Sequence, residues 1–290
     1  MTKIIREHYE SLDTVAGKIR GNGKFKWEER KVSVTSDFKF TGTESLSEAE
    51  KLLTEGWPEG SKLVTANASA IEAVSTGFQT SPSIFMDVAG AYPIAALAAA
   101  GDSCAMVSLA PIEDRKRPII RLVVQISVSA YYKKEEMQAY GIGLMAIIDN
   151  LEASSFRVEL NVGFFAARQD YFAALTICLK QAHDPLDRER VVFGLAHPSM
   201  LRRIMFKVME ANCPGDVFAS GYGTPSNPEA GKHYDPDMLF LPGPQTFRSR
   251  SAELQNPANT LKAMTPIINA ALTDKYNVPP PLNFNMEHVI

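Results

Sequence analysis

Three polar residues alternate at the end of the most strand-like run of the sequence. Gln125, Ser127 and Ser129 stand at the end of the apolar run Ile119–Val128 and directly after it. Their amide and hydroxyl groups are uncharged, so together they could hydrogen-bond a neutral or anionic ligand. The two serines could instead cap the helix expected at 134–153, because a serine hydroxyl accepts from the free amides of a first helical turn. Both roles stay open, and capping requires no ligand.

One carboxylate and several isolated histidines are the other candidates for acid–base or metal chemistry. Asp87 stands near the end of the predicted strand Ser83–Val88 and before a predicted helix. A carboxylate there could act on a substrate, or it could cap a turn. His183, His197 and His233 lie far from one another in the sequence, so a shared metal site or acid–base pair has little support.

The motifs of common catalytic classes are absent from the sequence. There is no G-x-x-x-x-G-K-[ST] phosphate loop, no G-x-S-x-G nucleophile turn and no H-E-x-x-H zinc helix. Cys104, Cys178 and Cys213 are far apart, which argues against a disulfide framework and a zinc site. Cys178 lies in an apolar run, as an inert buried thiol would. We therefore predict no catalytic residues, no metal and no cofactor.

A basic and aromatic stretch near the N-terminus is typical of sites that bind single-stranded nucleic acid. Such sites stack bases on aromatic rings and pair phosphates with cations. The alternative is a strand edge that its lysines keep soluble, and Glu28 and Glu29 favour that alternative. Further basic clusters could extend the surface if the fold brings them together. The predicted nucleic-acid residues are Lys24, Phe25, Lys26, Trp27, Arg30, Lys31, Arg115, Lys116, Arg117, Arg202 and Arg203.

Composition and charge place the chain among ordinary globular proteins. Its 290 residues are 45% hydrophobic and carry a net charge of −3, so no overall positive field draws it to nucleic acid or anionic lipid. The most apolar stretch, Ala89–Ala100, is too short and too interrupted to span a bilayer. The sequence predicts a cytoplasmic protein without a membrane partner.

The elements that would position these residues follow from hydrophobic periodicity. Helices are predicted at about 1–20, 46–55, 61–76, 93–100, 134–153, 186–196, 199–211 and 257–273. Strands are predicted at Lys31–Phe40, Ser83–Val88, Cys104–Leu109, Ile119–Val128, Phe156–Val162, Phe172–Lys180 and Met238–Leu241. In the helix at 199–211, Arg202 and Arg203 lie off the apolar stripe.

The order of these elements predicts the fold class. Strand, helix and strand over 119–162 indicate a parallel pair joined by a crossover helix. We predict an α/β fold with a mainly parallel, Rossmann-like central sheet flanked by helices. An α+β extension is expected over 1–80, the core domain over 81–276 and an extended tail over 277–290.

The predicted core resembles the von Willebrand factor type A fold over about residues 119–272. In that family the first strand ends in D-x-S-x-S, and the Asp and both Ser oxygens hold a divalent cation. Ser127 and Ser129 match the two serines, but Gln125 stands where the family has its aspartate. The resemblance therefore implies a degenerate metal site, because a neutral amide cannot supply the charge of a carboxylate.

A second resemblance rests on short motifs spread over about residues 45–160. The motifs are G-W-P-E-G (56–60), D-V-A-G (87–90), A-A-G-D-S-C-A-M-V (99–107), I-S-V-S-A (126–130) and R-V-E-L (157–160). They are similar to an uncharacterised family of proteins encoded by tailed bacteriophages and related mobile elements. This resemblance implies production in the cytoplasm of a bacterial host.

These observations predict a non-catalytic phage-encoded binding protein. Its expected target is nucleic acid, with single-stranded DNA favoured, or a phage or host protein of replication or transcription. One alternative is a structural or assembly protein of the phage particle. Another is a metal-dependent enzyme that uses Asp87 with the Ser127 and Ser129 loop. The sequence leaves self-association into a homo-oligomer open.

Overall fold

A six-stranded sheet organises the part of the chain that the structure, a computed structural model, describes. The described residues are 2–20, 37–67, 75–77, 84–90, 92–109, 118–153, 156–214, 222, 224–247, 256–276 and 282–284. Five strands lie in the order β1-β8-β7-β6-β10, and β9 pairs with β7 at one end. The strands are β1 (Lys3–Tyr9), β6 (Ile119–Gln125), β7 (Arg157–Arg168), β8 (Tyr171–Lys180), β9 (Thr224–Pro225) and β10 (Leu239–Leu241).

Strand directions confirm an α/β fold with a mainly parallel central sheet. β10, β6 and β7 run parallel, with Val123 of β6 opposite both Asn161 and Phe240. β8 returns antiparallel to β7, and β1 runs parallel to β8. The β6–β7 crossover is helix α7 (Lys134–Ala153), whose bounds are those predicted. A partly buried ion pair holds the end of α7, because Lys180 Nζ lies 2.8 Å from Glu152 Oε1 and donates to Val158 O.

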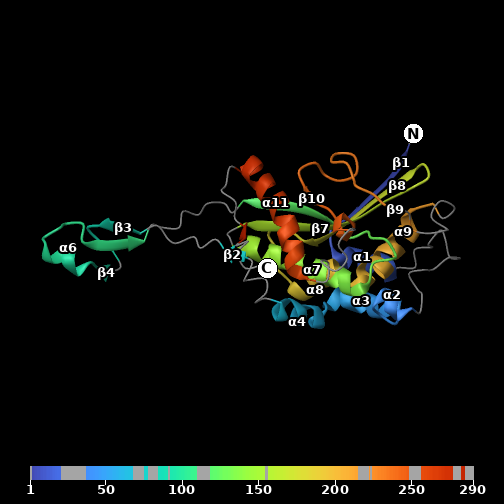
Figure 1. Cartoon of the computed structure of the whole chain (residues 1–290), viewed down its shortest axis with the longest axis horizontal. Helices are drawn as coiled ribbons and strands as arrows, with labels where there is room; N and C mark the ends of the chain where they lie inside the picture. The colour runs from blue at the N-terminus through green and yellow to red at the C-terminus, as the bar shows by residue number, and fades with distance from the viewer. Residues whose placement is uncertain are drawn as a thin grey trace.

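Helices cover one face of the sheet (Figure 1). Besides α6 (Ala95–Ala99), which lies apart from the central sheet, the described helical segments are α1 (Leu12–Arg20), α2 (Phe38–Thr41), α3 (Leu46–Glu55), α4 (Pro58–Ala66), α7, α8 (Arg188–Ala196), the π-helix η2 (Met200–Met205), α9 (Phe206–Asn212), the 3-10 turn η3 (Pro244–Phe247) and α11 (Pro257–Tyr276). The prediction of a helix at 46–55 is confirmed. Its cap is Ser45, whose side chain accepts from Glu48 N. No described helix is long and apolar enough to cross a membrane.

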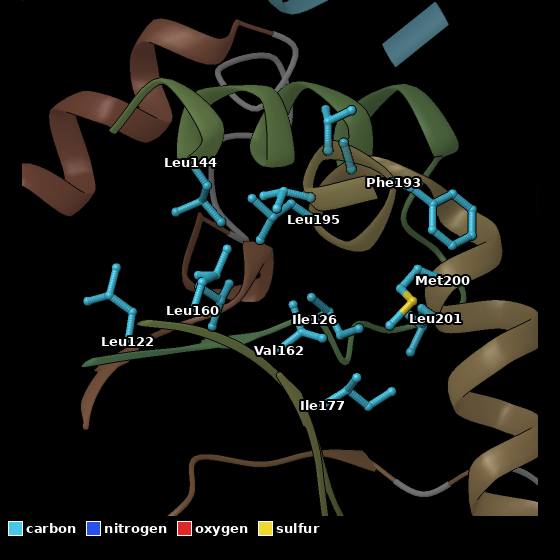
Figure 2. Close-up of a cluster of buried hydrophobic side chains, with 14 of the residues drawn as sticks. Leu122, Ile126, Leu144, Leu160, Val162, Ile177, Phe193, Leu195, Met200 and Leu201 are labelled. Carbon is cyan, nitrogen blue, oxygen red and sulfur yellow. The ribbon is translucent and has the colours of Figure 1, made fainter. Parts of the chain in front are cut away.

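The main core lies between the sheet and these helices (Figure 2). Leu122, Leu160 and Ile177 point up from the strands to meet side chains such as Leu144 and Phe193 of the helices. The opposite face of the sheet carries a smaller cluster. Because side chains alternate along a strand, Val123 and Phe165 face that way, where Tyr234 and Phe240 pack on them. The sheet is therefore covered by helices on one face and by the segment around Tyr234 on the other.

Several predicted elements near the N-terminus are wrong. Residues 3–9 form strand β1 rather than the first half of a helix, because parallel pairing with β8 stabilises the extended form. Residues 38–41 form helix α2, which Asp37 caps, rather than the end of a strand. β1 lies inside the central sheet, and residues of α1, α3 and α4 join the main core, so residues 1–67 are built into the body wherever they are described.

Two small sheets lie outside the central one. β11 (Leu282–Phe284), from the segment predicted as a tail, pairs antiparallel with β2 (Ser75–Gly77), at the end of a predicted helix. A three-stranded antiparallel sheet has the order β3-β5-β4, from β3 (Ile84–Asp87), β4 (Tyr92–Pro93) and β5 (Met106–Leu109). Helix α6 (Ala95–Ala99) joins β4 to β5. Figure 1 draws this unit at a distance from the main sheet. We call residues 84–90 and 92–109 the apolar unit.

Candidate functional site

The predicted ligand loop follows the carboxyl end of β6, the strand whose two neighbours come from different parts of the chain. The chain leaves β6 to form β7 on one side, and β10 later adds on the other. In α/β sheets such a switch point is the usual place for a ligand. Gln125 and Ser127 are both buried there.

Ser127 acts as a bridge between strands and not as a helix cap. Its hydroxyl donates to Phe165 O at 2.9 Å and accepts from Phe165 N at 3.2 Å. The first turn of α7 is capped instead by Glu136, whose carboxylate accepts from Lys133 N at 2.7 Å. The capping role proposed for Ser127 is therefore wrong. The backbone carbonyl of Ser129, its predicted companion, accepts from Tyr132 N.

The side-chain amide of Gln125 has hydrogen-bond partners for its nitrogen but not for its oxygen. Its Nε2 donates to Ser127 Oγ at 3.0 Å and to Ser226 O at 3.1 Å. Turning the amide round would set Oε1 against the Ser226 carbonyl, so this orientation is the favourable one. Its Oε1 is buried without a hydrogen-bond partner. Leaving such an acceptor unpaired costs about 1–3 kcal/mol.

The loop after β10 closes over this strand end. A Cβ on Gly243 would stand 2.8 Å from Gln125 O and 2.7 Å from Gln245 Oε1, so only glycine fits there. Two tyrosines hold the same loop, because Tyr140 donates to Pro242 O and Tyr132 to Pro244 O. The switch point is thus tightly packed, and its polar atoms are amides, hydroxyls and carbonyls.

Arg202 and Arg203 form a buried polar centre in η2. Arg203 is fully buried, and its guanidinium donates to Thr43 Oγ1 at 2.7 Å, Thr43 O at 2.7 Å and Thr41 Oγ1 at 3.0 Å. Ser199 completes the centre by donating to Thr41 O and bonding Thr43 Oγ1. Desolvation lowers the pKa of Arg203, against the opposing effect of Glu48. The centre ties the segment after α2 to η2.

Arg202 plays a similar internal role. It donates to Phe40 O at 2.6 Å and to Tyr132 O at 2.5 Å, and its guanidinium lies 4.1 Å from the Phe40 ring centre. Burial lowers its pKa to about 10, so it stays charged at neutral pH. The guanidinium groups of both arginines are hydrogen-bonded inside the fold. Their assignment to a nucleic-acid surface is corrected, because the π-helix turns both side chains inward.

His197 lies beside this centre in an aromatic cage. Its ring stacks on Phe193 and meets Trp57 edge-on, with ring centres 5.3 and 4.7 Å away. Its Nδ1 accepts from Ser199 N at 3.2 Å. Burial, and then the charge of Lys134, lower the pKa of His197 to about 4. The histidine is therefore neutral at pH 7 and packs as a core residue.

The other predicted site residues do not converge. Among the residues that the structure describes, no group of three or more His, Cys, Asp or Glu could hold a metal. Asp87 lies in the apolar unit, in a different sheet from Gln125, and its Oδ1 accepts from Val88 N. Burial raises the pKa of the Cys178 thiol to about 11, which fits an unreactive buried group. Outside the described residues lie Lys24, Phe25, Lys26, Trp27, Arg30, Lys31, Arg115, Lys116 and Arg117.

The apolar unit is the surface that the sequence did not single out. Met86, Val88 and Tyr92 are 57%, 67% and 53% exposed, and no residue of α6 is buried. Between 84 and 109 the charged residues are Asp87 and Asp102, without a lysine or arginine. Scattered apolar residues are normal on a surface, but a gathered set marks an interaction site. The signal available in the sequence was an apolar stretch of this length without a basic residue.

Comparison with known proteins identifies a family. The chain belongs to the family described as Domain of unknown function (DUF7192), whose model matches residues 1–269. The DUF7192 match therefore spans both the central sheet and the apolar unit. No curated protein and no solved structure matches the chain.

Proposed function

We propose that this chain is a non-catalytic binding protein that engages a partner protein through the apolar unit. The observation that carries the proposal is the exposure of Met86 and Tyr92, which both lie opposite Val107 of β5, and of Val88 directly after β3. Clusters of exposed apolar side chains are characteristic of protein–protein contact sites. The strand-end site supports the non-catalytic part, because its polar groups are neutral amides and hydroxyls.

Site-specific photocrosslinking tests the proposal directly. A photoreactive phenylalanine analogue at Val88 should give a discrete crosslinked protein in the cells that naturally produce the chain. The matched control is the same analogue at Leu63, an exposed apolar residue on α4. Crosslinking at Val88 no greater than at Leu63 would count against the apolar unit as a docking surface.

Binding of single-stranded nucleic acid is a second candidate, which rests on the basic and aromatic stretch at 24–31. Arg202 and Arg203 no longer contribute to it, since both are buried. A mobility shift with single-stranded DNA should weaken as salt rises, because cations on the protein displace counterions from phosphates. Changing Lys24, Lys26 and Arg30 to alanine together should reduce the shift, whereas Lys62→Ala on α4 should not. A shift unaffected by the triple change would exclude this stretch as the binding site.

We also propose that the core is a degenerate von Willebrand A domain. The order β6, loop, α7, β7 supports this, together with Gln125 and Ser127 at the strand end. Gln125→Asp would then restore the missing carboxylate, at a cost in stability because the position is buried. Magnesium should raise the melting temperature of Gln125→Asp and leave that of the wild type unchanged. Equal responses in the two proteins would contradict the likeness.

A further inference from the structure

The apolar unit buries few apolar side chains within itself. Of its side chains whose burial is described, Ala105 and Val107 are the buried hydrophobic ones. A few strands need a covered apolar face to be stable in water. The exposed apolar side chains of this unit are therefore suited to pack against another surface.

Among the described strands, β3 is the edge of the unit best suited to accept a further strand. β5 is central in this sheet, and β3 and β4 are its edges. β4 has two residues, and Pro93 has no amide hydrogen to donate to a neighbour. β3 has four residues and leads into Val88, which is 67% exposed.

Strand β1 offers a matching edge on the central sheet. It lies at the end of the strand order and pairs with β8 alone among the described strands. Ile5 and Tyr9 face the helices, so Ile4, Arg6 and His8 face the other way. These three residues are exposed, and none of them is acidic. An exposed edge with apolar and basic side chains is suited to receive a strand with apolar and acidic ones.

We infer that β3 of one copy of this chain adds to the β1 edge of a second copy. This inference rests on the proposed function and names the partner. The charges favour it, because the edge strand carries Lys3 and Arg6 against one acidic residue, Glu7, whereas the apolar unit carries Asp87 and Asp102 and no basic residue. Pairing of two apolar units would instead gather four aspartates without a basic residue from either unit. Since β3 and β1 are different surfaces, the contact is head-to-tail and can extend beyond a dimer.

Sedimentation velocity over a range of micromolar concentrations tests the inference with two variants. Met86→Ser with Val88→Ser blocks the apolar unit, and Ile4→Ser with Arg6→Glu blocks the edge. The wild type should form species larger than dimers as concentration rises. Each double variant alone should be monomeric, with association at least about tenfold weaker. An equimolar mixture should form a dimer and nothing larger, because one intact surface remains on each partner. Leu63→Ser should behave as the wild type.

The possible outcomes separate this inference from the proposed function. A wild type that stays monomeric, or an edge variant that associates normally, overturns the head-to-tail contact. If Val88 nevertheless crosslinks to a different protein, docking through the apolar unit stands and the second copy is excluded. If Val88 crosslinks to nothing above the Leu63 control, both proposals fail.

Discussion

The central sheet and the apolar unit differ in how far their apolar side chains are buried. In the sheet, residues such as Leu122, Leu160 and Val162 are buried by the helices above them. In the apolar unit, Met86 of β3 and Val88 directly after it are also apolar but are more than half exposed. Composition alone therefore does not decide burial. The central sheet is covered by layers of the same chain, whereas Met86, Val88 and Tyr92 of the apolar unit are exposed in the single chain.

The largest expected effect of a single change is at Arg203, in the body of the protein. Arg203→Met would remove the guanidinium donor from Thr41 Oγ1 and Thr43 Oγ1, and it would leave Thr43 O with the Thr41 hydroxyl as its remaining donor. We expect a loss of about 3–5 kcal/mol in the free energy of unfolding. Urea unfolding would measure it, with Lys62→Met on the exposed side of α4 as the control. A loss below about 1 kcal/mol would mean that the centre is dispensable.

Truncating a buried side chain of the main core should give the next largest loss in the free energy of unfolding. Leu160 is fully buried between β7 and the helices. Leu160→Ala should lower the free energy of unfolding by about 2–5 kcal/mol, from lost burial and the cavity left behind. Leu63→Ala on the surface should change it by less than about 0.5 kcal/mol. Equal effects would show that the layer between sheet and helices is loosely packed.

Low pH should lower the free energy of unfolding, because His197 is harder to protonate in the folded chain than in the unfolded one. Its folded pKa of about 4 lies below the ordinary value of 6.5, so the unfolded chain takes up the proton first. The contribution of neutral His197 to folding stability is complete above about pH 6.5 and is lost as the pH falls toward about 4. Between pH 7 and pH 5 we expect a loss of about 2 kcal/mol. His197→Asn, which keeps an acceptor for Ser199 N, should lack this part of the pH dependence in urea unfolding.

The smallest effect on stability should be in the apolar unit. Met86→Ser removes a side chain that is 57% exposed in the isolated chain. The free energy of unfolding of the isolated chain should change by less than about 0.5 kcal/mol. Thermal unfolding of dilute protein would measure this, and concentrated protein should show a larger difference if the unit is covered by a second copy. A large loss in dilute protein would mean that Met86 already packs within its own chain.

Local signals in the sequence predicted many elements, and distant contacts explain the misses. Ser45 and the periodicity of 134–153 specify helices from neighbouring residues alone, and both predictions are confirmed. Residues 3–9 have apolar spacing compatible with a helix, yet pairing with residues 171–177 makes them a strand. Gln125 was located correctly at a strand end. The inward turn of Arg202 and Arg203 could not be foreseen, because it depends on a π-helix and on polar partners some 160 residues earlier.

The pairing of β1 with β8 also determines how late the central sheet can form during synthesis of the chain. His8 and Thr176, which face each other across these strands, are 168 residues apart. At roughly 5–20 residues per second, the ribosome needs about 10–30 s to make that interval. During this time the first strand has no neighbour, and β8 cannot receive it until it leaves the exit tunnel. The central sheet therefore closes late, and a chaperone that shields residues 3–9 would act before the protein is complete.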